Sequence, residues 1–365
     1  MTRALKLPVI PWRVLVPPAI GLALSLAAAS LFILGLGESP SVLWEAIYEV
    51  CFKDFGLGYT LFYMTPYLFT GLAVAVCFQC GVFNIGGEGQ LYIGSIAVVI
   101  VSQAFPNAPA WIGIPLGIAT AAIAGGLWGG IAGWLKATRG SHEVIVTILL
   151  NFLGIALVNY LLLYPYDNPA NQTPETVEVG TAFQIPSLHE FFGWFGLNLF
   201  ESTPANTALF LGLFAAVACY FFLFHTTSGF ALRSVGQSAR ASKFAGISVN
   251  RQTILALTLG GALAGLVGVN EIMGYQHRLV EGFSPQYGFT GIAVALLARS
   301  HPLGVIVSAL LFGILQSSAW QLEFSSEKVT KELSMVIQGT LVAFVAAHAL
   351  WQKIPDLLRK RSAGT

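Results

Sequence analysis

Long apolar segments recur along the whole chain, and they limit the possible folds more than any other feature. A helix needs about 20 predominantly apolar residues to cross the hydrocarbon layer of a membrane. Of the 365 residues, 55% are hydrophobic and only 10% are charged, whereas soluble domains carry about 25% charged residues. The chain therefore lacks the polar surface that a soluble protein needs, and we expect an integral membrane protein.

The apolar segments predict ten transmembrane helices, of which the eighth is unusually short. Of the 18 lysines and arginines, 14 lie in segments that are cytoplasmic when the N-terminus is cytoplasmic, as the positive-inside rule requires. An odd number of spans would destroy this bias. We therefore expect an all-α polytopic membrane protein with both termini in the cytoplasm. The predicted spans are 14–36, 59–81, 83–104, 111–135, 143–164, 205–225, 252–273, 286–299, 302–321 and 333–351.

A weak internal repeat divides the chain into two halves. Residues 86–98, GGEGQLYIGSIAV, align with residues 282–294, GFSPQYGFTGIAV, with five identical positions. Since each half has an odd number of spans, the halves are inverted, and the two segments are expected to start near opposite membrane faces. The prediction is one transmembrane domain over residues 1–365, with a first half at about 12–164, an external loop at 165–204 and a second half at about 205–353.

The segment FNIGGEGQ, residues 83–90, places three glycines and a carboxylate between two apolar runs. In a helix, Asn84 and Glu88 lie on one face because they are four residues apart. A carboxylate inside a membrane is costly, which favours a functional role. A structural role near the helix start, where negative charge is favoured, is the alternative. Because segment 282–290 is also interrupted by Gly and Pro, the two segments together predict a transport pathway.

A second polar row lies in SHEVIVTILLNF, where Glu143, Thr147 and Asn151 repeat every four residues. Asn151 is about two turns inside the predicted span, and lining a pathway or hydrogen-bonding a neighbouring helix are equally good interpretations. Glycines at the same spacing occur in two other spans and predict close helix packing. They are Gly125, Gly129 and Gly133 in the first, and Gly261 and Gly265 in the second.

Motifs for catalysis or cofactor binding are missing from the sequence. The C-x-x-C pair Cys77 and Cys80 has no second pair, so small apolar side chains are a better interpretation than a metal site. Without G-x-x-x-x-G-K-[ST], the chain cannot itself hold the phosphates of ATP. We expect no catalytic residues, no metal, no cofactor and no nucleic-acid partner.

Three polar segments lie between the predicted spans. In residues 37–58, the positions Val42, Ile47, Val50 and Cys51 suit a short amphipathic helix on the membrane surface. Residues 165–204 begin with a turn-rich polar stretch and end in an aromatic cluster, and residues 226–251 carry an Ala/Ser/Arg run that suits a short surface helix. Each of them is either a partner-docking surface or a solvated loop.

Four segments, in their order along the chain, resemble the permease subunits of bacterial ABC importers for nucleosides and simple sugars, within the branched-chain amino acid/ribose permease superfamily. They are FNIGGEGQLYIG, SHEVIVTILLNF, SVGQSARASKFAGI and GFSPQYGFTGIAVALLARSHPLG. The resemblance implies nucleoside uptake by alternating access, driven by a separate ATPase subunit. Uptake of a ribose-like sugar is one alternative, and an ion-coupled secondary transporter in which Glu88 is the coupling carboxylate is another.

The resemblance also implies an assembly in the bacterial plasma membrane. Its partners would be a second permease subunit, identical or different, two cytoplasmic ABC ATPase domains that hold ATP and Mg, and an extracytoplasmic substrate-binding protein. Loop 226–251 would contain the coupling helix. Gly87 and Ser238 depart from the family pattern, which usually has a larger apolar residue and an Asn there, and Gly87 puts the substrate in question. The implied coupling residues are Arg233, Gly236, Arg240, Lys243 and Gly246.

Seven residues are the expected pathway groups, four of them polar and three aromatic. The aromatic side chains can contact a base, because they offer a flat face or an edge. The polar residues are Asn84, Glu88, Gln90 and Asn151, and the aromatic residues are Phe83, Tyr287 and Phe289.

Overall fold

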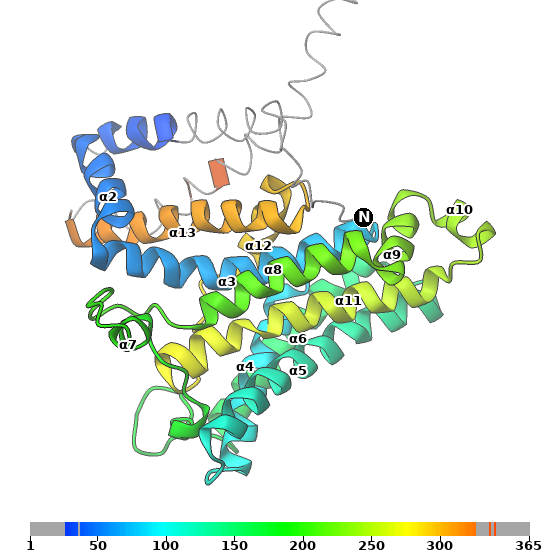
Figure 1. Cartoon of the computed structure of the whole chain (residues 1–365), viewed down its shortest axis with the longest axis horizontal. Helices are drawn as coiled ribbons and strands as arrows, with labels where there is room; N and C mark the ends of the chain where they lie inside the picture. Colours follow the sequence, from blue (N-terminus) through cyan, green and yellow to red (C-terminus); the bar gives the residue numbers. More distant parts are fainter. Residues whose placement is uncertain (1–25, 36, 326–335, 337–338, 341–365) are drawn as a thin grey trace, which may run out of the picture. The chain divides into compact units, whose positions relative to one another are not determined.

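The computed structural model of the protein describes residues 26–35, 37–325, 336, 339 and 340. These residues are predominantly helical, and their only β-structure is isolated bridges, which confirms the predicted all-α class (Figure 1). A short apolar helix, Leu26–Gly35, comes first. The later elements are α2 (Ser41–Phe52), α3 (Asp54–Gln79), α4 (Gly87–Ala104), α5 (Ala110–Arg139), α6 (Glu143–Leu163), the 3₁₀-helix η1 (Thr181–Phe183), α7 (Leu188–Gly193), α8 (Ala208–His225), α9 (Thr227–Gln237), α10 (Ala239–Phe244), α11 (Val249–Gly265), the π-helix η2 (Val269–Gln276), α12 (Tyr287–Leu297) and α13 (Pro302–Ser325).

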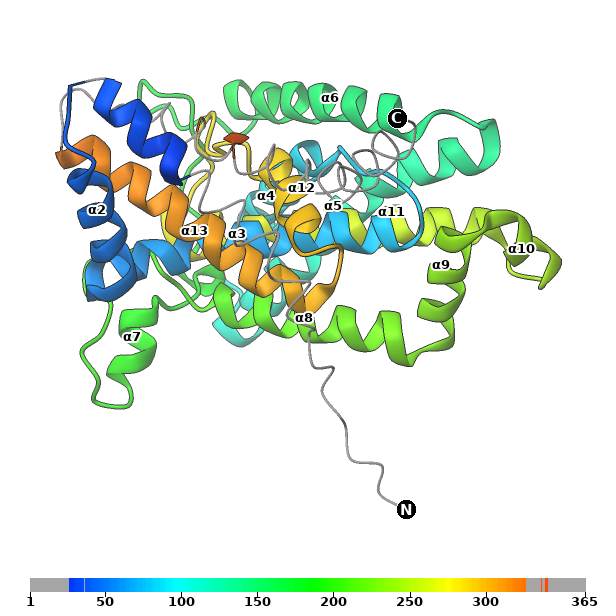
Figure 2. The same ribbon diagram turned by 90° about the horizontal axis from the view of Figure 1, so that it is seen from above.

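Two compact units make up the chain. One is Tyr48–Ser317, and the other comprises the described residues of Met1–Ile47 and Ser318–Thr365. Within the larger unit, α7 and the α9–α10 pair lie at opposite ends of α3, α8 and α11 (Figures 1 and 2). This separation agrees with the expectation that residues 165–204 and 226–251 face opposite sides of a membrane.

Six helices in the described part of the chain are long and apolar enough to cross a membrane: α3, α5, α6, α8, the continuous run Val249–Gln276, and Pro302–Leu322 in α13. The shorter helices α4 and α12 coincide with the predicted spans 83–104 and 286–299. The predicted span 14–36 is described only from residue 26, and the span 333–351 falls almost wholly outside the described residues. The count of ten spans and the side of the termini therefore remain predictions.

Helices α3 and α6 differ in how much protein surrounds them. In the most apolar 18-residue stretch of α3, 83% of the residues are buried, compared with 22% in the corresponding stretch of α6. The exposed residues of α6 include Ile145, Leu149 and Phe152, which are large and apolar. A helix that exposes such a face in a membrane protein contacts lipid or another subunit. Helix α3 is thus central, and α6 is peripheral along much of its length.

The glycine-rich faces of α5 and α11 pack directly against each other. A Cβ atom added to Gly125 would meet the carbonyl oxygen of Gly261, and a Cβ added to Gly261 would meet the carbonyl oxygen of Gly125. At Gly129, an added Cβ would meet the carbonyl oxygen of Leu257. The predicted packing role of these glycines is therefore confirmed, and the contact holds α11 in place before it continues into η2.

Both predicted surface helices are present. The amphipathic helix is α2, although its buried residues are Leu43, Ala46 and Val50, so that of the four predicted positions only Val50 is buried. The inward face is shifted around the helix because packing selects it, not the most apolar run of the sequence. In the loop 226–251, the Ala/Ser/Arg run forms α10, and Ser238 caps it by accepting a hydrogen bond from the Ala241 N–H.

Candidate translocation site

Helix α4 begins at Gly87, immediately after a buried pair of side-chain amides. Asn84 Nδ2 donates to Gln90 Oε1 at 3.0 Å, and Gln90 Nε2 donates to Asn84 Oδ1 at 3.1 Å. Asn84 Oδ1 also accepts a hydrogen bond from the Gly86 N–H at 2.9 Å. Both side chains are almost completely buried. The pair thus closes the turn that leads into α4 and satisfies polar groups that water cannot reach.

Helix α6 supplies the rest of the support for the start of α4. Asn151 Oδ1 accepts from the Gly89 N–H at 2.7 Å, and its Nδ2 donates to the Ile85 carbonyl at 2.8 Å. Thr147 Oγ1 accepts from the Ile85 N–H at 3.3 Å. The helices approach so closely that a Cβ added to Gly89 would lie 2.8 Å from the Asn151 Cα. Thr147 and Asn151 of the predicted polar row therefore face the start of α4, whereas Glu143 forms an ion pair with Lys136 of α5.

The carboxylate of Glu88 connects the start of α4 to the start of α12. Its Oε2 accepts a hydrogen bond from the Gly288 N–H at 2.7 Å, and the hydroxyl of Ser284 hydrogen-bonds to the same carboxylate. A Cβ added to Gly288 would overlap the backbone of Glu88 and of Gly87, so the two first turns are in contact. The first N–H groups of a helix have no partner within the helix, and Glu88 supplies one to α12.

A second buried carboxylate, Glu271 in the π-helix η2, reaches the same turn. It accepts a hydrogen bond from Asn270 Nδ2 at 3.2 Å and one from the hydroxyl of Tyr287. Asn206, at the start of α8, donates in turn to Asn270 Oδ1 at 3.2 Å. Glu271 is not among the pathway residues expected from the sequence. The signal was a carboxylate inside the predicted span 252–273, and short π-helices are frequent at functional sites.

Aromatic side chains enclose the beginning of α12 on two further sides. Tyr67 of α3 packs edge-on against Tyr287, with ring centroids 5.5 Å apart, and its hydroxyl donates to Gln316 Oε1 at 3.1 Å. Tyr92, one turn after Glu88 in α4, packs on Phe283 with centroids 4.7 Å apart. The residues before and within the first turn of α12 are therefore held between α3 and α4.

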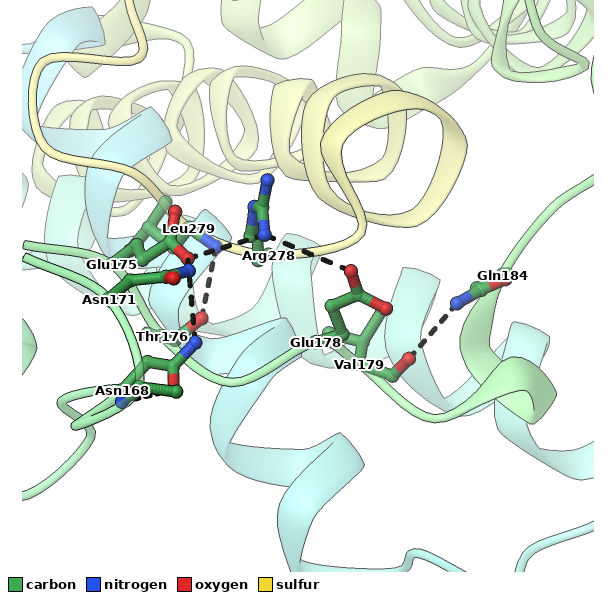
Figure 3. A network of polar contacts seen from close by, with 10 residues as sticks. Asn168, Asn171, Glu175, Thr176, Glu178, Val179, Gln184, Arg278 and Leu279 are labelled. Carbon is green, nitrogen blue, oxygen red and sulfur yellow. Dashed lines mark hydrogen bonds and ion pairs between the residues drawn. The ribbon is translucent and has the colours of Figure 1, made fainter. Parts of the chain in front are cut away.

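A polar network attaches the segment before α12 to the long loop 165–204 (Figure 3). Arg278 Nη1 lies 3.3 Å from Glu175 Oε1 and 3.9 Å from Glu178 Oε1. The Thr176 N–H donates to the Leu279 carbonyl at 2.9 Å, and the Leu279 N–H donates to the Thr176 hydroxyl at 3.0 Å. We call this network the outer-loop latch. It fixes the end of the segment that is remote from α12.

Five of the seven expected pathway residues meet at the two helix starts. Asn84, Glu88, Gln90, Asn151 and Tyr287 are all buried there. The two remaining residues are not buried. Phe83 packs on Phe78, with centroids 5.0 Å apart, and Phe289 is 43% exposed.

The expectation that segments 86–98 and 282–294 start near opposite faces is wrong for the helices themselves, because the Gly288 N–H donates directly to Glu88. Helix α12 has 11 residues, about 16 Å at 1.5 Å per residue, which is too short to cross about 30 Å of hydrocarbon. The two helices start 200 residues apart, at Gly87 and Tyr287. The repeat alignment requires a separation of 196 residues, so the helix starts do not occupy equivalent positions of the repeat.

The expected coupling residues lie on α9, α10 and the turn that follows. Arg233 Nε donates to the Leu223 carbonyl at 2.9 Å. A Cβ added to Gly236 would meet the carbonyl oxygen of Gln79, so α9 packs on the end of α3. Exposed side chains cover α10, whose last residue, Phe244, is 84% exposed. Arg240 and Lys243 are exposed, and Gly246 has a φ of 80°.

These features define a multi-pass helical membrane protein in which two short helices meet end to end, an arrangement found at the binding sites of transporters. Residues 56–346 match the family "Branched-chain amino acid transport system / permease component". The chain belongs to this family, and it is a transport subunit rather than an enzyme.

Relatives of similar length are named as ABC transporter permeases. The chain is 36% identical over 351 residues to the guanosine ABC transporter permease protein NupP of Bacillus subtilis, covering 96% of this chain and 98% of that protein. It is 30% identical to the nucleoside ABC transporter permease protein NupB of Lactococcus lactis, covering 92% and 91%. It is also 31% identical to the glucose ABC transporter permease protein TsgB13 of Haloferax volcanii, covering 94% and 90%.

Proposed function

We propose that this chain is the permease subunit of an ABC importer that takes up nucleosides by alternating access. The observation that carries this proposal is the similarity, over nearly the whole length of both proteins, to permeases named for guanosine and nucleoside transport. The structure is consistent with this proposal, because buried polar groups lie where the two helices α4 and α12 begin, as expected of a transport site.

The proposed pathway passes the meeting point of α4 and α12. Non-helical backbone at membrane depth is tolerated only beside protein or a water-filled cavity, and the segment before α12 is such backbone. Phe289 presents an exposed ring one residue beyond Gly288, and an aromatic face can contact a base. The wall of the proposed pathway consists of the buried residues at the two helix starts, namely Asn84, Glu88, Gln90, Asn151 and Tyr287.

Energy from ATP would reach the pathway through α9 and α10. The exposed ring of Phe244 and the exposed cations Arg240 and Lys243 form a compact surface at the tip of α10. Arginine and aromatic side chains are enriched at protein interfaces. Because α9 packs on the end of α3 through Gly236, movement of this tip is transmitted to the central helix.

The complete transporter would lie in the bacterial inner membrane. It would contain this chain, a second permease subunit, two ATPase domains that hold ATP and Mg, and an extracytoplasmic binding protein. The exposed apolar faces of the peripheral helices suit contact with lipid or with the second permease.

Uptake by the complete transporter tests this function. Radiolabelled guanosine, adenosine, uridine and glucose are presented to proteoliposomes that contain this chain and its partner subunits, with the binding protein outside and ATP inside. We expect ATP-dependent accumulation of nucleosides and none of glucose. Accumulation of glucose alone would replace the nucleoside assignment with the sugar alternative.

Proteoliposomes with this chain alone provide the second half of the test. A proton or sodium gradient is imposed in the absence of ATP. We expect no accumulation, because the chain has no ATPase motif and is expected to depend on its partners. Gradient-driven uptake by the isolated chain would identify a secondary transporter and contradict the proposed importer.

A further inference from the structure

Two buried carboxylates from different parts of the chain bind consecutive residues at the start of α12. Glu88 belongs to α4 in the first half and accepts from the Gly288 N–H. Glu271 belongs to η2 in the second half and accepts from the Tyr287 hydroxyl. Glu88 is 3% exposed and Glu271 is 1% exposed. The first turn of α12 is therefore fixed from two sides by two separate elements.

Neither carboxylate forms a salt bridge with a cation in the described part of the chain, since the ion pairs there involve other acidic residues. A buried carboxylate is costly unless hydrogen bonds compensate for the lost hydration. For Glu88 and Glu271, the hydrogen-bond donors include groups of the first turn of α12, namely the Gly288 N–H and the Tyr287 hydroxyl. Moving that turn would leave both carboxylates with fewer donors, so the free energy of their burial depends on where α12 begins.

The backbone before α12 leaves little freedom to this turn. His277 and Gln286, at the two ends of the connecting segment, both have positive φ angles, 55° and 64°. Residues other than glycine adopt this conformation only where their surroundings enforce it. Ser284 adds two contacts within the segment, because it hydrogen-bonds to Glu88 and its Oγ accepts from the Tyr287 N–H at 3.2 Å. The outer-loop latch holds the other end.

We propose that Glu88 and Glu271 are paired positioning residues, which together fix the first turn of α12 and thereby place Phe289 on the transport pathway. This proposal rests on the proposed function only in that it treats the surface near Phe289 as part of a transport pathway. The geometry of the two carboxylates, which can be tested without transport, carries the positioning role. Opening of the pathway then requires that at least one of the two carboxylates releases α12.

The test measures the accessibility of Phe289 in the assembled transporter. A reporter cysteine is introduced as F289C, after Cys51 and Cys219, which are not fully buried, have been replaced by serine. The rate of reaction with a water-soluble maleimide is measured in membranes. A second reporter, F195C, lies in the outer loop after α7, where Phe195 is 69% exposed, and it controls for general access of the reagent.

Loss of either carboxylate should change the labelling rate at F289C and leave F195C unaffected. We expect Glu271→Ala to change the rate about tenfold, the factor that corresponds to the free energy of one buried hydrogen bond. Glu271→Gln should have a smaller effect, because its amide oxygen can still accept from Tyr287. The matched control is Glu190→Ala, which removes a glutamate whose carboxylate bonds within the α7 capping box and should change neither reporter.

Tyr287→Phe is the decisive second variant, because it removes only the hydroxyl that Glu271 binds. It should reproduce the Glu271→Ala effect, and the double variant should add little to it, since residues in direct contact are non-additive. If Glu271→Ala fails to insert, Tyr287→Phe still decides. An unchanged labelling rate in Tyr287→Phe, or full additivity with Glu271→Ala, overturns the proposal.

Kinetics of uptake separate a positioning role from a structural one. We expect the variants to lower the maximal rate several-fold, with a smaller change in KM and with wild-type abundance in the membrane. If the abundance in the membrane fell in parallel with uptake, and Glu271→Gln restored both, the carboxylate would have a structural role instead. A wild-type transporter that moves no nucleoside would refute the proposed function and leave the labelling test of the positioning residues intact.

Discussion

The starts of α4 and α12 touch each other and yet are stabilised by different chemistry. Neutral groups hold α4, namely the amides of Asn84, Gln90 and Asn151. Carboxylates hold α12, and they come from α4 and η2. Neutral amides make moderate, short-range hydrogen bonds, whereas a carboxylate in its ionised form makes hydrogen bonds that are roughly twice as strong. The difference suggests that α4 is a fixed platform and that α12 is held strongly in one position from which it can be released.

The contact between the two starts depends on Gly288, and its replacement should have the largest effect. In Gly288→Ala the added methyl group would overlap the backbone of Gly87 and Glu88, which cannot move aside as a side chain can. We expect the free energy of unfolding to fall by up to about 3 kcal/mol and uptake to be lost. Thermal denaturation of the purified complex and an uptake assay measure both.

Gly193→Ala is the matched control for this prediction, because a Cβ added there meets nothing within 4 Å. Its stability and uptake should equal those of the wild type. A Gly288→Ala variant that is as stable as Gly193→Ala would show that the two helix starts are not in tight contact, and the comparison between them would lose its basis.

Alanine substitutions on the two sides measure the difference directly. Glu88→Ala should lower the free energy of unfolding by about 2–3 kcal/mol, because the buried Gly288 N–H loses its acceptor and is left without a partner. Asn151→Ala should lower it by about 1–2 kcal/mol, because the bonds lost to Gly89 and Ile85 are neutral. Chemical denaturation of the same complex compares the two. An equal or reversed order would mean that charge does not distinguish the helix starts.

The outer-loop latch should contribute less than either helix start. Arg278 is 38% exposed in its side chain, and ion pairs in contact with water contribute about 0–1 kcal/mol. Arg278→Ala should therefore lower the free energy of unfolding by less than about 1 kcal/mol, and should reduce uptake only partially. A loss of stability as large as that of Glu88→Ala would show that the latch, and not the carboxylates, holds α12.

The smallest effect concerns pH at the other end of α12, where His301 precedes α13. Burial beside Phe224 and Tyr220 lowers the pKa of His301 below 6.5. The unfolded chain therefore binds a proton more readily than the folded protein, and stability falls as the pH drops below about 6.5. The melting temperature, measured between pH 5 and pH 8, should fall less steeply toward acid pH in His301→Gln. An unchanged profile would exclude His301 as a contributor.

The sequence predicted the helices well where apolar length decides the outcome. The segments from 59–81 to 302–321 all coincide with helices, because hydrocarbon thickness sets their length. It showed that the eighth span is unusually short, but it could not show that this helix begins against α4 or that α11 continues into a π-helix. Both depend on tertiary packing, which hydropathy does not encode.

For the candidate site, the sequence identified Glu88 and Asn151 from polarity in an apolar setting, and the structure places both at the helix starts. It did not reveal their partners. The interrupted segments 83–90 and 282–290 predicted a shared pathway, but not the hydrogen bond between Glu88 and the Gly288 N–H, which lies 200 residues further along the chain. Glu271 escaped attention because it lies near the end of a predicted span, where a carboxylate can be mistaken for an interfacial residue.

The contact between the two helix starts has an electrostatic consequence. Each helix N-terminus carries about +0.5 elementary charge from its aligned peptide dipoles, and here two such ends converge on the carboxylate of Glu88. In its ionised form, Glu88 balances the sum of the two. A glutamine at this position would leave about one positive charge uncompensated in a medium of low dielectric constant. With an ionised glutamate, the two helix ends and the Glu88 side chain together carry no net charge.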